Sequence, residues 1–305
     1  MVSDEPLALA TVRSFLERRF PAVDDLSRFQ RGEWSSAFGF RAARRELVVR
    51  FGRYGDDYAK DRRAAGWAGP DLPIPRVLEL GEAFEGFYAV SERVRGLDLD
   101  ALDAAGYARI LPALFRALDA LRRVELPGSG FGIWRPDDAS APYRTWQEFL
   151  LSVAHRDDAR IHGWRAVLAS VPGAQASFDA AYARLEELVA VCPDRRGLVH
   201  GDLLAGNVLV DGERLTGVLD WANSLAGDPL YDVAWLTFWA PWHPGLDPTR
   251  VRALARELFG GPGFEERLQC YEVHIGLDAQ QYNAFTRRWS ELARSALRTL
   301  AVAER

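Results

Sequence analysis

The sequence contains very little lysine, cysteine or histidine. Lys60 is the single lysine among 38 basic residues, and the other 37 (38 − 1) are arginines. Any site that ordinarily uses a lysine must therefore use Lys60 or an arginine. The two cysteines, Cys192 and Cys270, are too few for a disulfide framework. The five histidines lack the spacing of zinc ligands, so a zinc site of the usual kind is excluded as well.

Long apolar runs and basic tracts are also missing. The longest apolar stretch, residues 233–242, is much shorter than the roughly 20 residues that cross a bilayer, and the N-terminus has no signal-like segment. The net charge is −5, and no basic tract carries interleaved aromatic residues, which argues against nucleic-acid binding. We therefore expect a cytoplasmic protein that binds neither nucleic acid nor membranes. With 305 residues, 48% of them hydrophobic, the chain can form one two-lobed unit or two domains.

Hydrophobic periodicity predicts a β-rich first third followed by a mainly helical remainder. Apolar positions at helical spacing indicate helices, and short β-rich runs bounded by turn residues indicate strands. The helices are expected at residues 7–20, 57–67, 107–124, 146–154 and 174–191, and the strands at 26–30, 37–41, 46–51, 77–80 and 87–91.

Residues 198–210, with the sequence LVHGDLLAGNVLV, are the most informative stretch. An apolar strand leads into Asp202, Asn207 follows five residues later, and Asp220 comes after two further β-rich runs. Phosphoryl transfer from a nucleotide uses such a set, because one carboxylate accepts the proton of a hydroxyl while an amide oxygen and a second carboxylate hold Mg²⁺. Taken alone, Asp202 is more simply a turn or cap residue. Its register with Asn207, Asp220 and Asp232 favours the catalytic interpretation.

The chain lacks the activation segment by which protein kinases are regulated. Asp220 and Asp232 are only twelve residues apart (232 − 220). No phosphorylation site and docking segment of the protein-kinase type fit into that interval. We therefore expect a small hydroxylated acceptor rather than a peptide.

These motifs, together with residues 227–234 (GDPLYDVA), resemble those of the aminoglycoside phosphotransferase family, kinase-like enzymes that phosphorylate small molecules. The resemblance covers nearly the whole chain and is closest to the members that act on hygromycin B. It implies an α+β, two-lobed protein-kinase-like fold. Residues 1–94 would form a small β-rich N-lobe that binds the nucleotide, and residues 95–305 a larger, mainly helical C-lobe with the catalytic loop and the acceptor-binding helices. The further segments that carry the resemblance are residues 11–20, 72–75, 129–132, 145–146 and 275–278.

The resemblance also implies how the nucleotide is bound. Arg50 stands where the family has its phosphate-anchoring lysine, and Asp61 is placed to pair with it; a surface arginine is the alternative, and Lys60 is the rival cation. Backbone groups at Ser91 and Arg93 would bond the adenine. The turn at residues 32–36, which contains Ser35 and Ser36, could lay backbone N–H groups over the phosphates. From the residues alone, a plain hairpin is the simpler interpretation of that turn.

Two residues are expected to support the catalytic loop rather than to react. The resemblance implies that Asp232 braces the loop by bonding its backbone. His200 is expected to bond backbone groups in the loop and not to act as a base.

The acceptor is expected near Trp239 and Trp242, beside a Pro-rich turn that includes Pro248. Core packing is the simpler role for a tryptophan, whereas two such rings could wall a sugar-binding cleft. On the next helical stretch, a carboxylate facing the cleft would pair with an aminocyclitol ammonium, although a solvated helix face is an equally good interpretation. The candidates there are Glu272, Asp278 and Gln281.

Together these features predict a monomeric, ATP- or GTP-dependent phosphotransferase that uses Mg²⁺ and acts on a hydroxyl of a small molecule. An aminocyclitol antibiotic of the hygromycin type is the first choice of acceptor, which would make the protein an antibiotic-resistance enzyme. A kinase of another small alcohol, such as a macrolide, a choline-like amine or a sugar, is the alternative. A nucleotide-binding module without catalysis is the third possibility, and only the replacement of lysine by Arg50 favours it.

Overall fold

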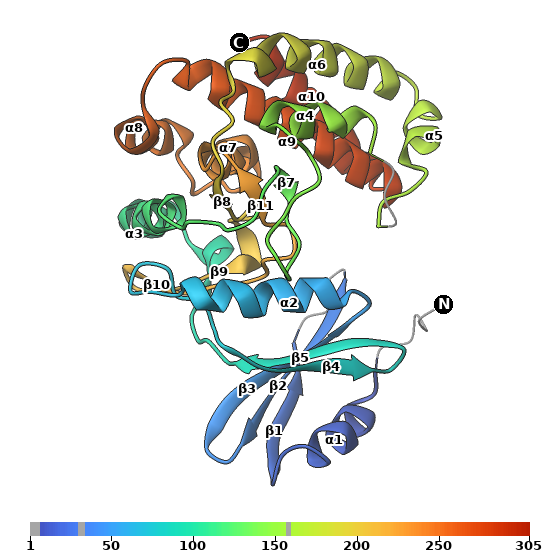
Figure 1. Cartoon of the computed structure of the whole chain (residues 1–305), viewed down its shortest axis with the longest axis vertical. Helices are drawn as coiled ribbons and strands as arrows, with labels where there is room; N and C mark the ends of the chain where they lie inside the picture. The colour runs from blue at the N-terminus through green and yellow to red at the C-terminus, as the bar shows by residue number, and fades with distance from the viewer. Residues whose placement is uncertain (1–6, 30–33, 157–159) are drawn as a thin grey trace. The chain divides into compact units, whose positions relative to one another are not determined.

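The computed structural model describes residues 7–29, 34–156 and 160–305. By its packing the chain divides into two compact units, coloured from blue to red along the chain in Figure 1. The first unit comprises Met1–Ala101, Arg135–Asp137 and Ala205–Ala222; the second comprises Leu102–Trp134, Asp138–Leu204 and Asn223–Arg305. The segment from Ala205 to Ala222, which contains Asn207 and Asp220, thus belongs with the N-terminal residues, whereas Asp202 belongs to the second unit. The simpler division at residue 94 stays a prediction.

The first unit is built on a five-stranded antiparallel sheet with the strand order β1-β2-β3-β5-β4. Its strands are β1 (Val23–Arg28), β2 (Ser35–Ala42), β3 (Arg45–Gly52), β4 (Val77–Ala83) and β5 (Gly86–Glu92). Side chains alternate between the two faces of a strand. In β3, Leu47, Val49 and Phe51 are buried in the core, which places Arg50 on the opposite face.

Helix α1 (Leu9–Glu17) covers the core face of this sheet, and Figure 1 shows it beside β1. It is shorter than the expected 7–20, but its buried residues lie on one face as the periodicity predicts. The ring of Phe15 packs edge-on against Phe51 and Tyr88, at centroid separations of 5.2 and 4.8 Å. Such aromatic pairs stabilise a core beyond the area they bury.

Two further elements complete the first unit. Helix α2 (Gly55–Ala64) buries two charged residues, Lys60 and Asp61. A small antiparallel sheet with the order β10-β9-β6 contains a hairpin of β9 and β10. Its strands are β6 (Leu97–Asp98), β9 (Val208–Asp211) and β10 (Arg214–Val218).

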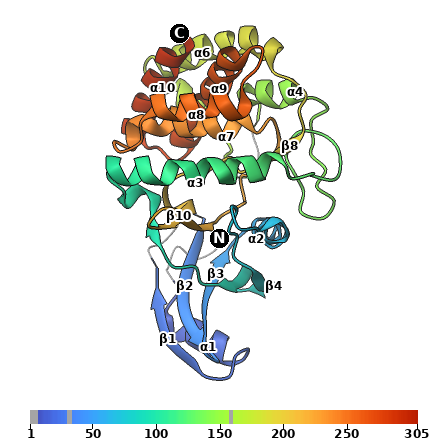
Figure 2. The ribbon, with the colours of Figure 1, turned by 90° about the vertical axis from the view of Figure 1, so that its left-hand side faces the viewer.

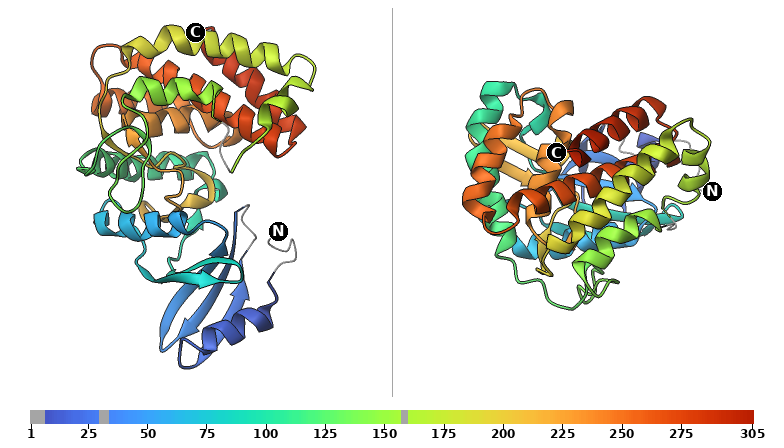
Figure 3. Two further views of the ribbon diagram at one scale, coloured as in Figure 1. Left: turned by 45° about the vertical axis from the view of Figure 1, so that its right-hand side comes forward. Right: turned by 90° about the horizontal axis from the view of Figure 1, so that it is seen from above.

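The second unit is mainly helical and is organised around α9 (Phe264–Phe285), most of whose residues are buried. Helices α6, α9 and α10 pack against one another, as Figures 2 and 3 show, and α7 packs on α9 as well. The other helices are α3 (Ala104–Arg122), α4 (Trp146–Leu151), α5 (Trp164–Ala169), α6 (Ala174–Leu188), α7 (Leu230–Trp239), α8 (Pro248–Phe259) and α10 (Trp289–Ala303). A three-stranded antiparallel sheet has the order β7-β11-β8, with β7 (Gly132–Ile133), β8 (Gly197–Val199) and β11 (Leu225–Gly227).

The expected α+β class is confirmed, with an antiparallel sheet in the N-terminal part and helices in the C-terminal part. Within residues 7–29, 34–156 and 160–305, no helix is both long enough and apolar enough to span a membrane.

Candidate functional site

The loop that carries Asp202 begins at the end of β8, a fully buried strand that pairs with β11. Gly201 has a φ of +76°, in the left-handed region that favours glycine. A Cβ atom at this position would lie 2.7 Å from the Asn223 carbonyl oxygen. Both the backbone conformation and the close approach of Asn223 therefore require a glycine directly before Asp202.

The side chain of Asp232, in the first turn of α7, binds backbone N–H groups of this loop. One carboxylate oxygen accepts the N–H of His200 at 2.9 Å, and the other accepts the N–H of Gly201 at 2.8 Å. The side chain is fully buried. Burial raises the pKa of Asp232 to about 7, against the two N–H donors, which lower it. The contacts are those that the resemblance implied.

His200 makes a second local contact within the loop. It is fully buried, and its Nδ1 accepts the backbone N–H of Asp202 at 3.2 Å. The proton of a neutral imidazole is therefore assigned to Nε2. The side chain of Asp202 is half-buried, whereas Leu203 and Leu204 are buried and anchor the loop in the core. The apolar residues after Asp202 thus have a packing role.

In the first unit, Arg50 on β3 and Asp61 on α2 form an ion pair. The guanidinium also lies 5.1 Å from the centroid of the Tyr58 ring. Burial alone would lower the pKa of Arg50, but the carboxylates of Asp61 and Asp220 outweigh it and raise the pKa. Arg50 thus remains a fixed positive charge.

Asp61 and Lys60 both contact the segment that follows Asp220. The second carboxylate oxygen of Asp61 accepts the N–H of Trp221 at 2.9 Å. The Nζ atom of Lys60 donates to the carbonyl of Ala222 at 2.8 Å, and the Lys60 side chain is 2% exposed. The two consecutive residues of α2 therefore bind two consecutive residues of the segment.

The proposed metal ligands, Asn207 and Asp220, lie at the open end of the β9–β10 hairpin. The N–H of Leu219 donates to the carbonyl of Asn207 at 2.8 Å, which ties the two ends of the hairpin together. Asp220 is exposed and has a φ of +58°. An amide and a carboxylate oxygen are donors that suit Mg²⁺, which binds through few protein ligands and completes its shell with phosphate and water. The donor chemistry thus fits this metal.

The other predicted nucleotide contacts are only partly described by the structure. In the predicted turn, residues 32 and 33 lie outside the described residues. Ser35 and Ser36 are the first residues of β2 and continue its ladder with β3, so they do not form a turn. Ser91 lies in β5, and the N–H of Arg93 donates to the Glu46 carbonyl at 3.0 Å. A nucleotide contact at Arg93 would therefore have to use its carbonyl oxygen.

Trp239 and Trp242 lie together at the end of α7, with ring centroids 4.9 Å apart. Both are half-buried. The Trp242 Nε1 atom donates to Glu291 at 2.7 Å, and the guanidinium of Arg294 lies 4.0 Å from its ring centroid. The pair is thus held from α10, an element that the sequence interpretation did not identify.

The three polar candidates on α9 differ in accessibility. Glu272 is fully buried and accepts hydrogen bonds from Arg252 at 3.0 and 2.9 Å, so a role in binding the acceptor does not fit its contacts. Gln281 is also fully buried and donates to a backbone carbonyl, which likewise disfavours that role. The side chain of Asp278 is 37% exposed and pairs with Arg156. Of the three, only Asp278 is accessible enough to meet a ligand.

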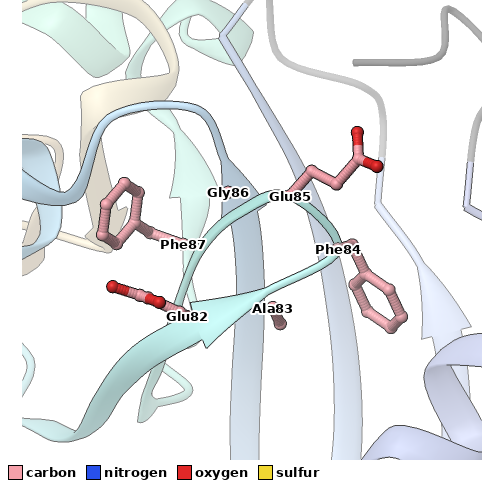
Figure 4. Close-up of a pocket in the computed structure, with 6 residues that line it drawn as sticks. All are labelled: Glu82, Ala83, Phe84, Glu85, Gly86 and Phe87. Atoms are coloured by element: carbon pink, nitrogen blue, oxygen red, sulfur yellow. The ribbon is translucent and has the colours of Figure 1, made fainter.

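A surface depression of ≈ 390 Å³ lies at the turn between β4 and β5, and Figure 4 shows its lining. It is formed by six consecutive residues of one hairpin, 82–87, none of which is a predicted site residue. Phe84 and Glu85 have positive φ angles of 52° and 59°, as in a tight two-residue hairpin turn. The depression is a consequence of that turn.

Comparison with known proteins agrees with this geometry. The model of the phosphotransferase enzyme family matches residues 25–269. The chain belongs to the phosphotransferase enzyme family. It is 35% identical over 281 residues to a hygromycin-B 4-O-kinase of Escherichia coli, covering 89% of this chain and 78% of that protein. It is 33% identical over 138 residues to a homoserine kinase of Pseudomonas aeruginosa, covering 45% and 39%.

A solved structure is similar over nearly the full length. A thermostable mutant of aminoglycoside phosphotransferase APH(4)-Ia, in a ternary complex with AMP-PNP and hygromycin B, matches with a TM-score of 0.86 and 32% identity. The match covers 96% of this chain and 98% of that chain. The expected family, the kinase-like fold and a nucleotide-dependent phosphotransferase activity are confirmed.

Sequence interpretation named Lys60 only as a rival cation for the phosphates and did not identify Arg156. The contact of Lys60 with Ala222 joins residues 162 positions apart, and the pairing of Arg156 with Asp278 joins residues 122 apart. Neither pair has a local signal in the sequence. The rarity of lysine and the position of Lys60 beside Asp61 pointed to this residue, but as a cation for the phosphates.

Proposed function

We propose that this phosphotransferase moves the γ-phosphate of ATP or GTP, with Mg²⁺, to a hydroxyl of an aminocyclitol antibiotic of the hygromycin B type. The observation that carries the proposal is the similarity over 89% of the chain to a hygromycin-B 4-O-kinase. The loop that contains Asp202 and Asn207 supports it, because its residue types are those that the chemistry requires.

In this proposal Asp202 acts on the hydroxyl of the acceptor. Its carboxylate orients that hydroxyl and accepts the proton late in the transfer, because a loose transition state needs positioning more than a strong base. Gly201 and Asp232 support this role by holding the backbone before Asp202.

In this proposal Asn207 and Asp220 are the protein ligands of the metal. A bound Mg²⁺ would neutralise charge on the β- and γ-phosphate oxygens. Arg50 would bind the phosphates of the nucleotide, and its ion pair with Asp61 keeps the guanidinium in one position. An arginine suits phosphate because its planar fork can donate two parallel hydrogen bonds.

The acceptor would be bound by Trp239, Trp242 and Asp278. The faces of the two indole rings would pack on sugar rings, and the carboxylate of Asp278 would pair with an ammonium group of an aminocyclitol. Because Asp278 already pairs with Arg156, a substrate ammonium must compete with that guanidinium. We further propose that the protein acts as a cytoplasmic monomer.

The proposal is tested by nucleotide turnover with Mg²⁺ and hygromycin B, beside a panel of other aminoglycosides and with both ATP and GTP. We expect turnover to depend on hygromycin B. Nucleotide binding without stimulation by hygromycin B would contradict the proposed acceptor while leaving the phosphotransferase chemistry in place.

A kinase of another small alcohol is the second candidate. The observation that favours it is the partial similarity to a homoserine kinase, although this spans only 39% of that protein. Adding homoserine, choline, macrolides and simple sugars to the same panel separates the two candidates. A module without catalysis would show binding but no turnover with any of them.

A further inference from the structure

The loop that carries Asp220 has an unfavourable backbone conformation. Asp220 adopts a φ of +58°, which costs a residue other than glycine of the order of 1 kcal/mol or more. Its side chain accepts a long hydrogen bond, 3.4 Å, from the N–H of Ala222. Such a conformation persists where neighbouring groups hold it.

Helix α2 supplies those groups. Directly after Asp220, the N–H of Trp221 is bound by Asp61, and the carbonyl of Ala222 is bound by the ammonium group of Lys60. One N–H group and one carbonyl on successive residues are thus bound by successive residues of one helix. The loop cannot rotate about Asp220 without breaking at least one of these bonds.

The contact of Lys60 is a costly arrangement for stability alone. A lysine that is 2% exposed has lost most of its hydration, and burying a charge is unfavourable unless strong hydrogen bonds compensate for it. A charged donor makes a stronger bond to a carbonyl than a neutral one does. The single lysine of the chain therefore stands where the backbone beside Asp220 is held.

We propose that Lys60 is a positioning residue, which fixes the carboxylate of Asp220 for the metal by holding the Ala222 carbonyl. This inference rests on the proposed role of Asp220 as a metal ligand. It also assigns the two candidate cations to different tasks: Arg50 binds the phosphates, and Lys60 binds the loop.

The test compares metal binding with nucleotide binding. Mn²⁺ serves as the probe, because its binding to the protein with AMP-PNP is followed by electron paramagnetic resonance. AMP-PNP affinity without a metal is measured separately by calorimetry. The variants are Lys60→Met, with Arg62→Met as the matched control because Arg62 is an exposed cation on the same helix. Circular dichroism checks that each variant is folded.

We expect Lys60→Met to weaken Mn²⁺ binding and to lower kcat by about 10- to 100-fold, as losses of residues that orient metal ligands do. AMP-PNP affinity without metal and the KM of the acceptor should change by less than about twofold, a difference too small to reflect a lost charge contact. Arg62→Met should resemble the wild type. Equal losses of AMP-PNP affinity with and without metal would overturn the proposal and make Lys60 a phosphate ligand.

A second variant keeps the proposal testable. Lys60→Ala leaves space for a small amine, so propylamine should restore part of the Mn²⁺ affinity and of kcat in a saturable way, whereas propanol should not. A purely packing role would be restored by both or by neither, and either result would overturn the proposal.

Asp220→Asn separates this inference from the proposed function. If Asp220→Asn weakens Mn²⁺ binding and Lys60→Met does not, the role of Lys60 is wrong and the metal site stands. If Asp220→Asn leaves Mn²⁺ binding unchanged, the metal site is wrong and the role of Lys60 fails with it.

Discussion

The carboxylate of Asp232 and the N–H of Gly201 are joined by a 2.8 Å hydrogen bond, although the two residues are 31 positions apart in the sequence. Gly201 directly precedes Asp202, so a buried side chain on α7 determines the backbone conformation of the loop. Asp232 thus holds the backbone directly before Asp202, the residue that we propose orients the acceptor hydroxyl.

Replacing Asp232 by asparagine should impair catalysis more than binding. The amide keeps one acceptor but presents an N–H group to one of the two backbone donors, and a buried unpaired donor costs about 1–3 kcal/mol. We expect kcat to fall by about tenfold or more, which corresponds to at least ~1.4 kcal/mol of transition-state stabilisation. The KM of the nucleotide should change little. Steady-state kinetics of Asp232→Asn measure this, with Asp179→Asn, an exposed carboxylate on α6, as the control. A change in nucleotide KM alone would contradict the assignment.

Stability should depend on pH through Asp232. Because its pKa in the folded state is about 7, against an ordinary value of 3.8, the folded protein binds this proton more tightly than the unfolded chain does. The stabilisation is complete below about pH 4 and is lost as the pH rises to about 7. The rise in pKa corresponds to a contribution of ~4 kcal/mol to the free energy of unfolding.

Urea unfolding at a series of pH values between 4 and 8 measures this effect. The free energy of unfolding of the wild type should fall over this range relative to that of Asp232→Asn, which cannot titrate at this position. Parallel pH dependences of the two proteins would show that Asp232 does not titrate as stated.

The ion pair of Arg50 and Asp61 should be strongly coupled. Removing one partner leaves a largely buried charge without its counterpart, which costs about 3–5 kcal/mol, whereas removing both avoids that penalty. In a double-mutant cycle of Arg50→Met and Asp61→Asn, the double variant should therefore lose less stability than the sum of the single variants. Thermal and urea unfolding measure the coupling, and additive losses would contradict it.

The same variants report on nucleotide binding. Both proteins that lack Arg50 should bind ATP about tenfold more weakly or worse, equivalent to ~1.4 kcal/mol, because the phosphates lose a charged donor. Arg45→Met, which removes an exposed arginine from the same strand, should bind ATP like the wild type.

Much of this molecule was predictable from sequence because the decisive signals are local. Asp202, Asn207 and Asp220 all lie within a stretch of 19 residues (220 − 202 + 1). The alternating apolar residues of β3 place Arg50 on the face away from the core. The Trp-rich helix α7 was likewise recognisable by its apolar composition.

The remaining features depend on contacts between distant segments. The pairing of Leu97 with Val210 joins the β9–β10 hairpin to the first unit, and no local pattern in the sequence predicts this pairing. Helix α8 did have a local signal that was misinterpreted as a turn: Pro248 is its first residue, and the side chain of Asp247 caps it by accepting the N–H of Thr249 at 2.9 Å. The burial of Glu272 depends on Arg252, twenty positions away, and could not be inferred from helical periodicity alone.

The most direct test of the account is mass spectrometry of hygromycin B after incubation with ATP, Mg²⁺ and either the wild-type protein or Asp202→Ala. The wild type should add the mass of one phosphoryl group to the antibiotic. Asp202→Ala should yield almost no product while still binding ATP, and Asp211→Ala, an exposed carboxylate on β9, should behave like the wild type. Retention of more than about a tenth of the wild-type rate by Asp202→Ala, a loss of only ~1.4 kcal/mol, would contradict the role assigned to this residue.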